Sequence, residues 1–491
     1  MTNEITSPLP PDDRAKLRAL RPSDSLTPDP DFSPRYPLHQ SRQQSIEVRT
    51  PYQKDLDRLL YNYYTRRLAR VTQVAAVAKR LGRIDGSTYQ VPHNRLTHSL
   101  KVGQVARRTA HYLAEDIGNT KGISAAGGID FDIAEFAGRA HDIGHPPFGH
   151  AGEEALSELA KSWGLEDGFE GNAQTFRILT YLTSKFSKDQ HVRGLDLTYA
   201  STASVVKYPW DSRHSLSKKK KGKFGYYDVD AYAFKTFVQP LLYTESKGTL
   251  EAQIMDWADD VSYAVHDVED FAFQGKIPVY SLTVTENDFH EFWLHASSKL
   301  EGYSSSDIKD IQALFRKTLN DYFSIPLDDT EASQLRMSAF VSAVIERTSR
   351  DTSVTHTGAL AVRSRSRGLV EALKHLTWHY VINRPELHSR QQGDTRVLKA
   401  VASELYRIAT ETCSKDTSEM EHWLATPLVE SIENSVQQYT DSNVESFRSF
   451  DDDDKTKLGV ARGVIDYVAS LTEDDVFGLY ELYGLSAAPI V

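Results

Sequence analysis

Apolar residues recur at helical spacing along most of this 491-residue chain, and convincing strand alternation is nearly absent. The stretch after Tyr52 is typical, because its apolar and aromatic residues have helical spacing: Leu56, Leu59, Leu60, Tyr63 and Tyr64, then Leu68, Val71 and Val74. An amphipathic helix needs a second element to cover its apolar face, and the chain has no internal repeat that would stack as a solenoid. The sequence therefore predicts a mostly α fold with few or no strands.

One pair of expected helices is separated by a turn of unusual composition. The stretch 131–144, FDIAEFAGRAHDIG, has helical spacing and ends before Pro146 and Pro147, because proline cannot continue a helix. A second helix, HAGEEALSELAKSWG, follows the turn. The stretch 138–155 holds three of the 17 histidines of the chain, one aspartate and two glutamates: His141, His145, His150, Asp142, Glu153 and Glu154. So many titratable groups beside a stiff backbone indicate a functional site.

Charge and cysteine content narrow the classes of partner and site. The net charge of −11 argues against a dominant nonspecific nucleic-acid surface, although it leaves room for a local basic groove. Cys413 is the only cysteine, so no internal disulfide is possible and a metal must be held by histidines and carboxylates. We find no secretory signal pattern at the start and no run of eighteen apolar residues. These features predict a soluble protein in a reducing, cytoplasmic setting, without a membrane partner.

His141 and Asp142 form a dipeptide that is a weak signal alone, since a structural histidine bonded to an aspartate is common. A further histidine, His98, lies one expected helix earlier, and Asp259 lies in a later helix, "MDWADDVSYAVHDVED". The order H…HD…D on three separate helices resembles the HD superfamily of metal-dependent phosphohydrolases. That resemblance implies an HD-superfamily helical core in which His98, His141, Asp142 and Asp259 bind one divalent metal per active site.

Two imidazoles and two carboxylates suit a first-row divalent ion. Mn²⁺, Fe²⁺, Co²⁺, Ni²⁺, Zn²⁺ and Mg²⁺ all stay open. Such an ion would leave coordination positions for a water and a phosphate oxygen.

Seven motifs in order make the resemblance narrower. They are "RRLARVTQV" (66–74), "HNRLTHSLKV" (93–102), "HDIGHPPFGHAGE" (141–153), "FEGNAQTFR" (169–177), "GLDLTYA" (194–200), "KYP" (207–209) and "ADDVSYAVHDVED" (258–270). Together they are similar to the deoxyguanosinetriphosphate triphosphohydrolase family. The resemblance implies that water attacks the α-phosphorus of a deoxynucleoside triphosphate, dGTP or several dNTPs, which releases a deoxynucleoside and intact triphosphate.

The same resemblance implies roles for further residues. His150 would lie beside the α-phosphate, and Glu153, at i+3 on the same helix face, could orient it for proton transfer. Asp259, Tyr263 and Asp267 share one helix face, with the Tyr263 ring against the deoxyribose and Asp267 on its 3′-hydroxyl. The complete set of implied substrate-binding residues is Gln73, Arg95, His145, Asn172, Lys207, Tyr208, Lys223, Tyr263 and Asp267.

Several residues near these motifs have plainer interpretations. His93 and His266 fit structural or peripheral roles, and Asp260 is expected to point away from the metal to cap or pair. Asn172 could simply cap the helix that follows "FEG", or it could buttress the metal-side loop together with Arg177. The lysine run 218–221 is either a solvated loop or a functional one, whereas DDDDK at 451–455 is typical of a charged helix start.

We expect three regions: a flexible or surface-wrapping N-terminal tail at 1–45, an HD-type catalytic core at 46–275, and a C-terminal helical region at 276–491. The last region would pack on the core and contribute to the substrate site and oligomer contacts. The resemblance also implies a homo-oligomer, such as a hexamer. Base specificity, a regulatory nucleotide and single-stranded DNA binding stay open.

Two other functions share the H…HD…D pattern. One is another HD phosphohydrolase, a 5′-nucleotidase or phosphodiesterase, which has little need for Gln73, Tyr263 and Asp267 together. The other is a non-catalytic nucleotide- or single-stranded-DNA-binding protein. All four implied metal ligands are present, together with His150 and Glu153. Their presence argues against a protein that keeps the HD fold but has no catalytic activity.

Overall fold

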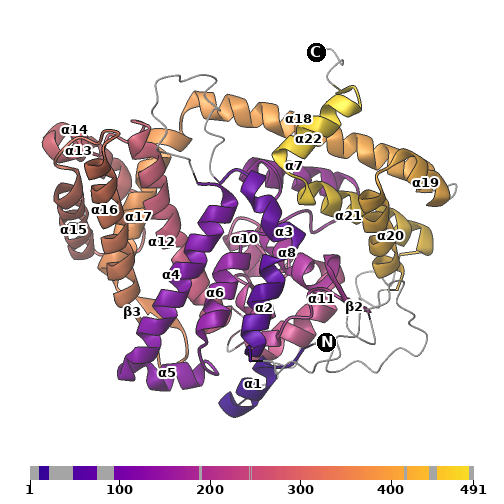
Figure 1. The fold of residues 1–491 in the computed structure, drawn as a ribbon, viewed down its shortest axis with the longest axis horizontal. Coiled ribbons are helices and arrows are strands. Elements are labelled where there is room, and N and C mark those ends of the chain that lie inside the picture. Colours follow the sequence, from indigo (N-terminus) through magenta and orange to yellow (C-terminus); the bar gives the residue numbers. More distant parts are fainter. Residues whose placement is uncertain are drawn as a thin grey trace.

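The computed structural model describes residues 10–21, 48–73, 93–186, 191–242, 244, 246–413, 417–441 and 450–485. Within these ranges the protein is almost wholly helical, which confirms the mostly α prediction (Figure 1). The strands form two antiparallel pairs, β1 (Ser184–Phe186) with β2 (His191–Arg193) and β3 (Thr352–Val354) with β4 (Leu360–Val362). Most of the predicted tail at 1–45, and Val74 of the first motif, lie outside the described residues.

Three helices form the centre of the molecule: α4 (Arg95–Glu115), α6 (Phe131–Ala140) and α12 (Leu250–Phe273). The backbones of α4 and α6 touch where Gly103 faces Gly138. A Cβ atom on Gly138 would lie 2.6 Å from the Cα of Gly103, so a larger residue there would push the helices apart. This close approach brings His98 of α4 and His141, which ends α6, to the same side of the core.

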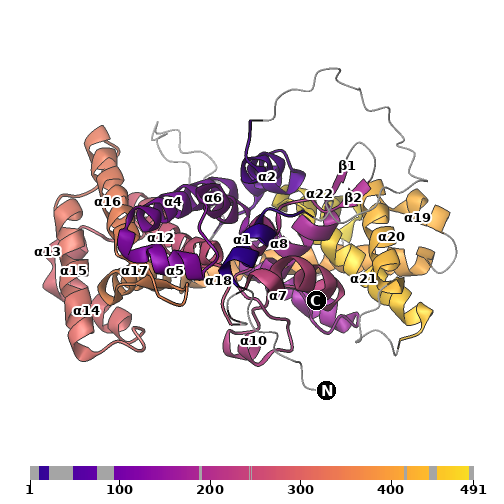
Figure 2. The ribbon, with the colours of Figure 1, turned by 90° about the horizontal axis from the view of Figure 1, so that it is seen from below.

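The first apolar core joins α4 and α12 to a helical lobe at one end of the molecule (Figures 1 and 2). It includes Val261 of α12, Phe315 and Leu373, all of them buried, so the predicted catalytic and C-terminal regions share this core. The lobe consists of α13 (Ser281–Val284), α14 (Glu286–Ser297), α15 (Ser305–Phe323), α16 (Glu331–Arg350), α17 (Ser364–Thr377) and the π-helix η8 (Trp378–Ile382).

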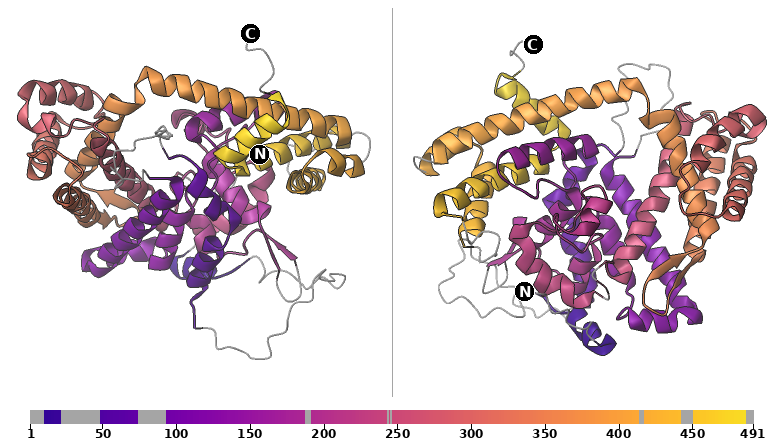
Figure 3. Two further views of the ribbon diagram at one scale, coloured as in Figure 1. Left: turned by 45° about the horizontal axis from the view of Figure 1, so that its top comes forward. Right: turned by 180° about the vertical axis from the view of Figure 1, so that it is seen from behind.

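A second core lies at the opposite end, where α18 (Pro385–Cys413) crosses the molecule (Figure 3). Leu398 of α18 and Leu156 are both fully buried in it. The helices around this core are α7 (Gly149–Ser162), α19 (Thr417–Trp423), α20 (Thr426–Thr440), α21 (Asp452–Ser470) and α22 (Glu473–Leu482).

A third core packs beneath α6 and contains Leu59, Phe136 and Phe176. Its α-helices are α2 (Pro51–Leu60), α3 (Tyr63–Arg67), α8 (Gly171–Arg177), α9 (Tyr199–Ser204) and α11 (Ala231–Ala233). Short 3₁₀ or π turns accompany them: η2 (Leu68–Arg70), η4 (Ile178–Leu182), η5 (Asp228–Asp230), η6 (Phe234–Val238) and η7 (Gln239–Leu241).

The described part of the predicted tail packs against the body. It forms α1 (Pro11–Arg18), and the buried Arg18 makes an ion pair with Glu251 at the start of α12. Arg21 follows and lies 2.7 Å from Asp55 of α2. These contacts fit a segment that wraps the surface.

Local predictions had mixed outcomes. The expected connector at 121–130 is partly helical, because α5 (Thr120–Ala125) occupies its first half after the 3₁₀ turn η3 (Ile117–Asn119). The lysines 218–221 are exposed at the end of α10 (Ser215–Lys219), and Asp451 caps α21 through the Asp454 amide, as a charged helix start requires. Within the described ranges, no helix has the length and apolarity to cross a bilayer.

Candidate active site

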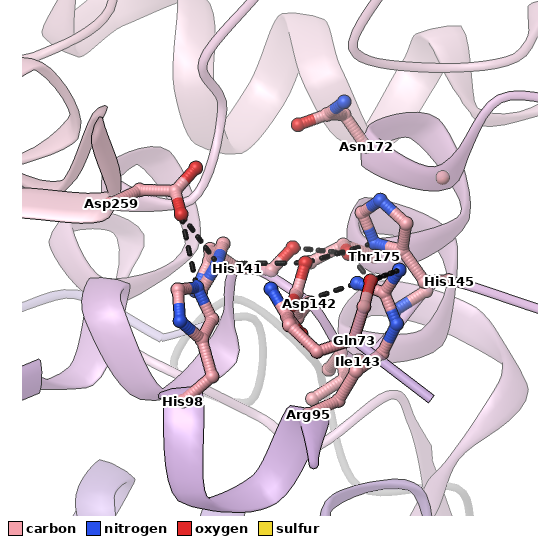
Figure 4. A network of polar contacts seen from close by, with 12 residues as sticks. Gln73, Arg95, His98, His141, Asp142, Ile143, His145, Asn172, Thr175 and Asp259 are labelled. Atoms are coloured by element: carbon pink, nitrogen blue, oxygen red, sulfur yellow. Dashed lines mark hydrogen bonds and ion pairs between the residues drawn. The ribbon is translucent and has the colours of Figure 1, made fainter. Parts of the chain in front are cut away.

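Three elements bring the predicted metal ligands together (Figure 4). His98 lies in the first turns of α4, His141 ends α6 with Asp142 directly after it, and Asp259 lies midway along α12. His98 Nε2 is 3.1 Å from Asp259 Oδ1, and His141 Nε2 is 3.5 Å from the same oxygen. Three potential ligand atoms therefore converge on one point.

The orientation of His141 suits a ligand. Its Nδ1 donates to the carbonyl oxygen of Gly138 at 2.8 Å, which leaves Nε2 facing Asp259, where a metal would take the place of the Nε2 proton. Metal-bound histidines are commonly oriented in this way by a backbone carbonyl. The donor set of His98, His141 and Asp259 fits a divalent ion on these grounds.

Asp142 lies slightly apart from this group because other residues engage it. Its Oδ2 accepts a hydrogen bond from Arg95 at 2.9 Å, while its Oδ1 is 3.4 Å from His141 Nε2 and 3.1 Å from His145 Nδ1. The His145 contact lacks the geometry of a hydrogen bond, since that nitrogen has no bonding partner. Oδ1 of Asp142 is thus the oxygen that could join the metal.

The charges around the ligands reinforce one another. Burial alone would lower the pKa of His141. The carboxylates of Asp142 and Asp259 have a larger, opposite effect, so the pKa rises from its ordinary 6.5 to about 9. Burial raises the pKa of Asp142, yet His141 and Arg95 hold it well below its usual range. The two carboxylates therefore stay ionised and favour a cation between them.

The turn between His141 and His150 is held tightly. Thr175 of α8 accepts from the Gly144 amide and donates to the His141 carbonyl, both at 3.1 Å. Phe148 has a φ of 66°, a left-handed conformation that costs a non-glycine residue energy. A Cβ on Gly152 would lie 1.9 Å from the Pro147 carbonyl oxygen, so α7 begins in direct contact with the turn.

Across the turn, His150 and Glu153 form the pair that the i, i+3 spacing predicts. His150 Nδ1 is 3.0 Å from Glu153 Oε2, and the His150 side chain is 76% exposed, so its Nε2 edge is accessible. Glu153 Oε1 accepts from the Gly171 amide and from Lys223 Nζ, each at 2.8 Å. Burial raises the pKa of Glu153, but these interactions hold it well below its usual range.

His145, His150 and Glu153 are close enough to suggest a second metal site. The neighbouring cations argue against it, because Lys223 Nζ already binds Glu153. Burial and the guanidinium of Arg95 lower the pKa of His145 to about 3, and this guanidinium adds a second positive charge beside the group. With Lys223 and Arg95 nearby, a second metal ion would be repelled. The His150–Glu153 pair therefore fits proton transfer better than metal binding.

The ligands open onto a cavity of about 520 Å³. Eight of the nine predicted substrate-binding residues line it: Gln73, Arg95, His145, Asn172, Lys207, Tyr208, Lys223 and Tyr263. Asp267 is not among its lining residues; it is buried deeper along α12, and burial together with Asp270 raises its pKa well above the usual range. Lys207 makes an ion pair with Asp256 and lies 3.9 Å from Asp259 Oδ2.

Comparison with known proteins agrees with this arrangement. The HD domain family matches residues 95–264, which include every potential metal ligand. A deoxyguanosinetriphosphate triphosphohydrolase-like protein of Streptomyces coelicolor is 35% identical over 72% of this chain and 81% of its own length. The chain belongs to the deoxyguanosinetriphosphate triphosphohydrolase-like family. The resemblance predicted from the seven motifs is thereby confirmed.

Other members of this family give similar values. The protein of the same name from Corynebacterium glutamicum is 33% identical over 72% of this chain and 79% of its own length. The one from Corynebacterium efficiens is 42% identical, over 47% of this chain and 48% of its own length. Membership of the triphosphohydrolase-like family places the protein among the HD-domain phosphohydrolases.

Some residues near the family motifs differ from expectation. Glu170, not Asn172, caps α8 by accepting from two backbone amides, and Asn172 donates to Glu170 instead. Arg177 does not reach the metal-side turn, because it is fully buried in ion pairs with Asp230 and Asp466.

Other residues near the motifs have partners of their own. Asp260 pairs with Lys374 at 2.6 Å but also lines the cavity. His93 pairs with Asp270 and stacks on His266, as peripheral roles require.

Sequence reasoning missed the cavity wall that the later part of the chain contributes. Its polar and apolar members are Lys374, Trp378, Ile382, Leu387, Arg390, Gln391, Asp394 and Glu473. None belongs to a short motif.

Proposed function

We propose that the protein hydrolyses deoxynucleoside triphosphates to a deoxynucleoside and inorganic triphosphate, with a divalent metal held by His98, His141, Asp142 and Asp259. The observation that carries the proposal is the pairing, in one cavity, of this ligand group with the His150–Glu153 pair across a stiff turn. Positioning of this kind is the main contribution of a protein to phosphoryl transfer.

The metal supplies Lewis acidity: when bound, it polarises the α-phosphoryl group or acidifies the attacking water. The water oxygen bonds to the α-phosphorus as the bond from that phosphorus to the 5′ oxygen breaks. His150 transfers a proton to the leaving 5′ oxygen, and Glu153 stabilises the imidazole in its charged form. The proton that the attacking water loses is released to solvent, and His150 takes up a proton again before the next turnover. One water is consumed, and the triphosphate leaves intact.

The other cavity residues account for the substrate class. Arg95, Lys207 and Lys223 supply positive charge for the triphosphate. Tyr263 offers a ring to pack beneath C2′ of the sugar, where a ribose hydroxyl would clash. Gln73 has a buried Oε1 without a bonding partner, which suits a contact with the sugar edge. Tyr208, His145, Asn172 and Asp267 complete the proposed set, and Asp267 would act on the 3′-hydroxyl only after a shift toward the cavity.

The test is incubation with each of the four dNTPs plus Mn²⁺ or Mg²⁺, followed by chromatography of the products. We expect deoxynucleoside and triphosphate, and loss of both activity and bound metal in the His141→Ala variant. Glu269→Gln, on the same helix as Asp259 but paired with Lys101, is the matched control and should behave as wild type. Monophosphate plus pyrophosphate, or full activity of His141→Ala, would contradict the proposal.

A further inference from the structure

Arg67, the last residue of α3, is buried in an unusual environment. Its guanidinium donates to three backbone carbonyl oxygens: Ile143 at 2.9 Å, His145 at 2.6 Å and Leu471 at 3.2 Å. Among the described residues, none makes an ion pair with Arg67, and its Nε has no hydrogen-bond partner. A charge buried without an ion-pair partner is costly, so a buried arginine at this position calls for an explanation.

The three acceptors are not a random set. Ile143 directly follows the metal-ligand pair His141–Asp142, and His145 lies in the same turn, before His150. One nitrogen of Arg67 binds both of these carbonyls, which fixes the two peptide groups relative to each other. Thr175 holds the turn from the other side, through the His141 carbonyl and the Gly144 amide.

The third acceptor connects the turn to a distant part of the chain. Leu471 lies between α21 and α22, and Glu473 two residues later accepts from the backbone and hydroxyl of Thr72 at 2.9 Å each. Both Thr72 and Glu473 line the cavity. The contact through Arg67 therefore connects the turn to a C-terminal segment that contributes Glu473 to the cavity wall.

We propose that Arg67 is a positioning residue that sets the distance between the metal ligands and His150 by clamping the turn 143–145. The inference rests on the proposed function, because it gives Arg67 a role in that reaction. It touches neither the substrate nor the metal; it acts only through the backbone carbonyls of the turn. Burial lowers the pKa of Arg67, but only to about 10, so the clamp keeps its charge and its donors at neutral pH.

The experiment compares wild type with Arg67→Ala, Arg67→Met and Arg67→Lys. Loss of the clamp should lower kcat roughly 100-fold, because small displacements of catalytic groups have effects of this size. The KM for dNTP should change less than kcat, because Lys207 and Lys223 lie on other elements and only His145 of the proposed substrate set lies in the clamped turn. Mn²⁺ affinity, measured by calorimetry on the metal-free protein, should fall roughly tenfold or more, as expected for residues that orient metal ligands.

Chemical rescue separates positioning from a general structural role. Guanidinium at millimolar concentration should restore much of the kcat of Arg67→Ala, because it can occupy the vacated space and donate to the same carbonyls. Arg67→Lys should show kcat between wild type and Arg67→Met, since one ammonium group cannot reproduce the planar fork. Arg70→Ala is the control, because Arg70 is an exposed neighbour that lies 3.8 Å from Asp474.

The outcomes are distinct. If Arg67→Ala fails to fold, Arg67→Met, which keeps the apolar stem and lacks the donors, takes its place. A folded variant with wild-type kcat and Mn²⁺ affinity overturns the inference, as does a loss of kcat in Arg67→Ala that guanidinium does not relieve. If wild type hydrolyses no dNTP, the proposed function fails, and the Mn²⁺ titration alone then decides the role of Arg67.

Discussion

Glu153→Gln removes a negative charge beside His150 while keeping the shape of the side chain. Oε1 of Glu153 already receives two donors, the Gly171 amide and Lys223, so the glutamine oxygen should take that place. The glutamine NH₂ then faces His150 Nδ1, which must accept instead of donate. His150 then loses the carboxylate that stabilises its charged form.

The size of the effect follows from the geometry. Two unit charges at the 3.0 Å separation of His150 Nδ1 and Glu153 Oε2 attract by about 1.4 kcal/mol in bulk water and about 5.5 kcal/mol at an effective dielectric of 20. The His150 side chain is 76% exposed, so the lower value is closer. We therefore expect kcat to fall about tenfold to 100-fold, since about 1.4 kcal/mol is tenfold in rate.

The assay is the initial rate of deoxynucleoside release at saturating dNTP and Mn²⁺. Mn²⁺ affinity should stay at the wild-type value, because Glu153 is not in the proposed ligand set. Glu154→Gln, an exposed neighbour on α7, controls for the loss of one charge. A Glu153→Gln enzyme with kcat within twofold of wild type would refute the proton-transfer role of the pair.

Three other changes address the sugar pocket and stability. Tyr263→Ala should reduce the preference for dNTP over NTP, measured as a ratio of kcat/KM, by roughly tenfold or more. Gly138→Ala forces a Cβ to 2.6 Å from the backbone of α4 and should lower the free energy of unfolding by about 1–3 kcal/mol in urea denaturation. Burial, aided by the charge of Asp167, raises the pKa of Asp228 to about 6 from an ordinary 3.8. The native state thus favours the neutral form of Asp228. Ionisation of this carboxyl lowers the free energy of unfolding above pH 6, whereas below pH 4 the carboxyl is neutral in both the folded and the unfolded state and has no such effect. Asp228→Asn should therefore stabilise more at pH 8 than at pH 4, by at most about 3 kcal/mol.

Each of these has a contrasting outcome. Unchanged sugar discrimination would remove Tyr263 from the sugar pocket. Gly393→Ala in α18, where a Cβ meets no atom within 4 Å, should raise the unfolding free energy by about 0.5–1 kcal/mol, and equal effects at Gly138 and Gly393 would contradict the packing argument. A pH-independent effect of Asp228→Asn would show that the carboxyl is not destabilised by burial.

The sequence was most informative where chemistry and local spacing coincide. Helical periodicity and the proline pair located α6, the turn and α7, and the i, i+3 spacing predicted the contact of His150 with Glu153. The prediction that His98, His141 and Asp259 converge rested on the family resemblance of the ordered motifs. Residue spacing within one helix does not show which helices pack together. That meeting depends on the close packing of α4 and α6 at Gly103 and Gly138.

The sequence was least informative where a contact joins distant segments. Arg177 lies in a recognisable motif, yet its carboxylate partner Asp466 is 289 residues away, and only the fold brings them together. The cavity wall that includes Lys374, Trp378 and Glu473 depends in the same way on how α17, η8 and α22 pack. Arg67 binds only backbone carbonyls, which leave no trace in side-chain patterns.

The central claim is that water attacks the α-phosphorus of a dNTP at the metal group facing His150. Its most direct test is hydrolysis of a dNTP in H₂¹⁸O with Mn²⁺, followed by mass spectrometry of both products. We predict one ¹⁸O atom in the triphosphate and none in the deoxynucleoside. Label in the deoxynucleoside, or the appearance of monophosphate and pyrophosphate, would contradict it.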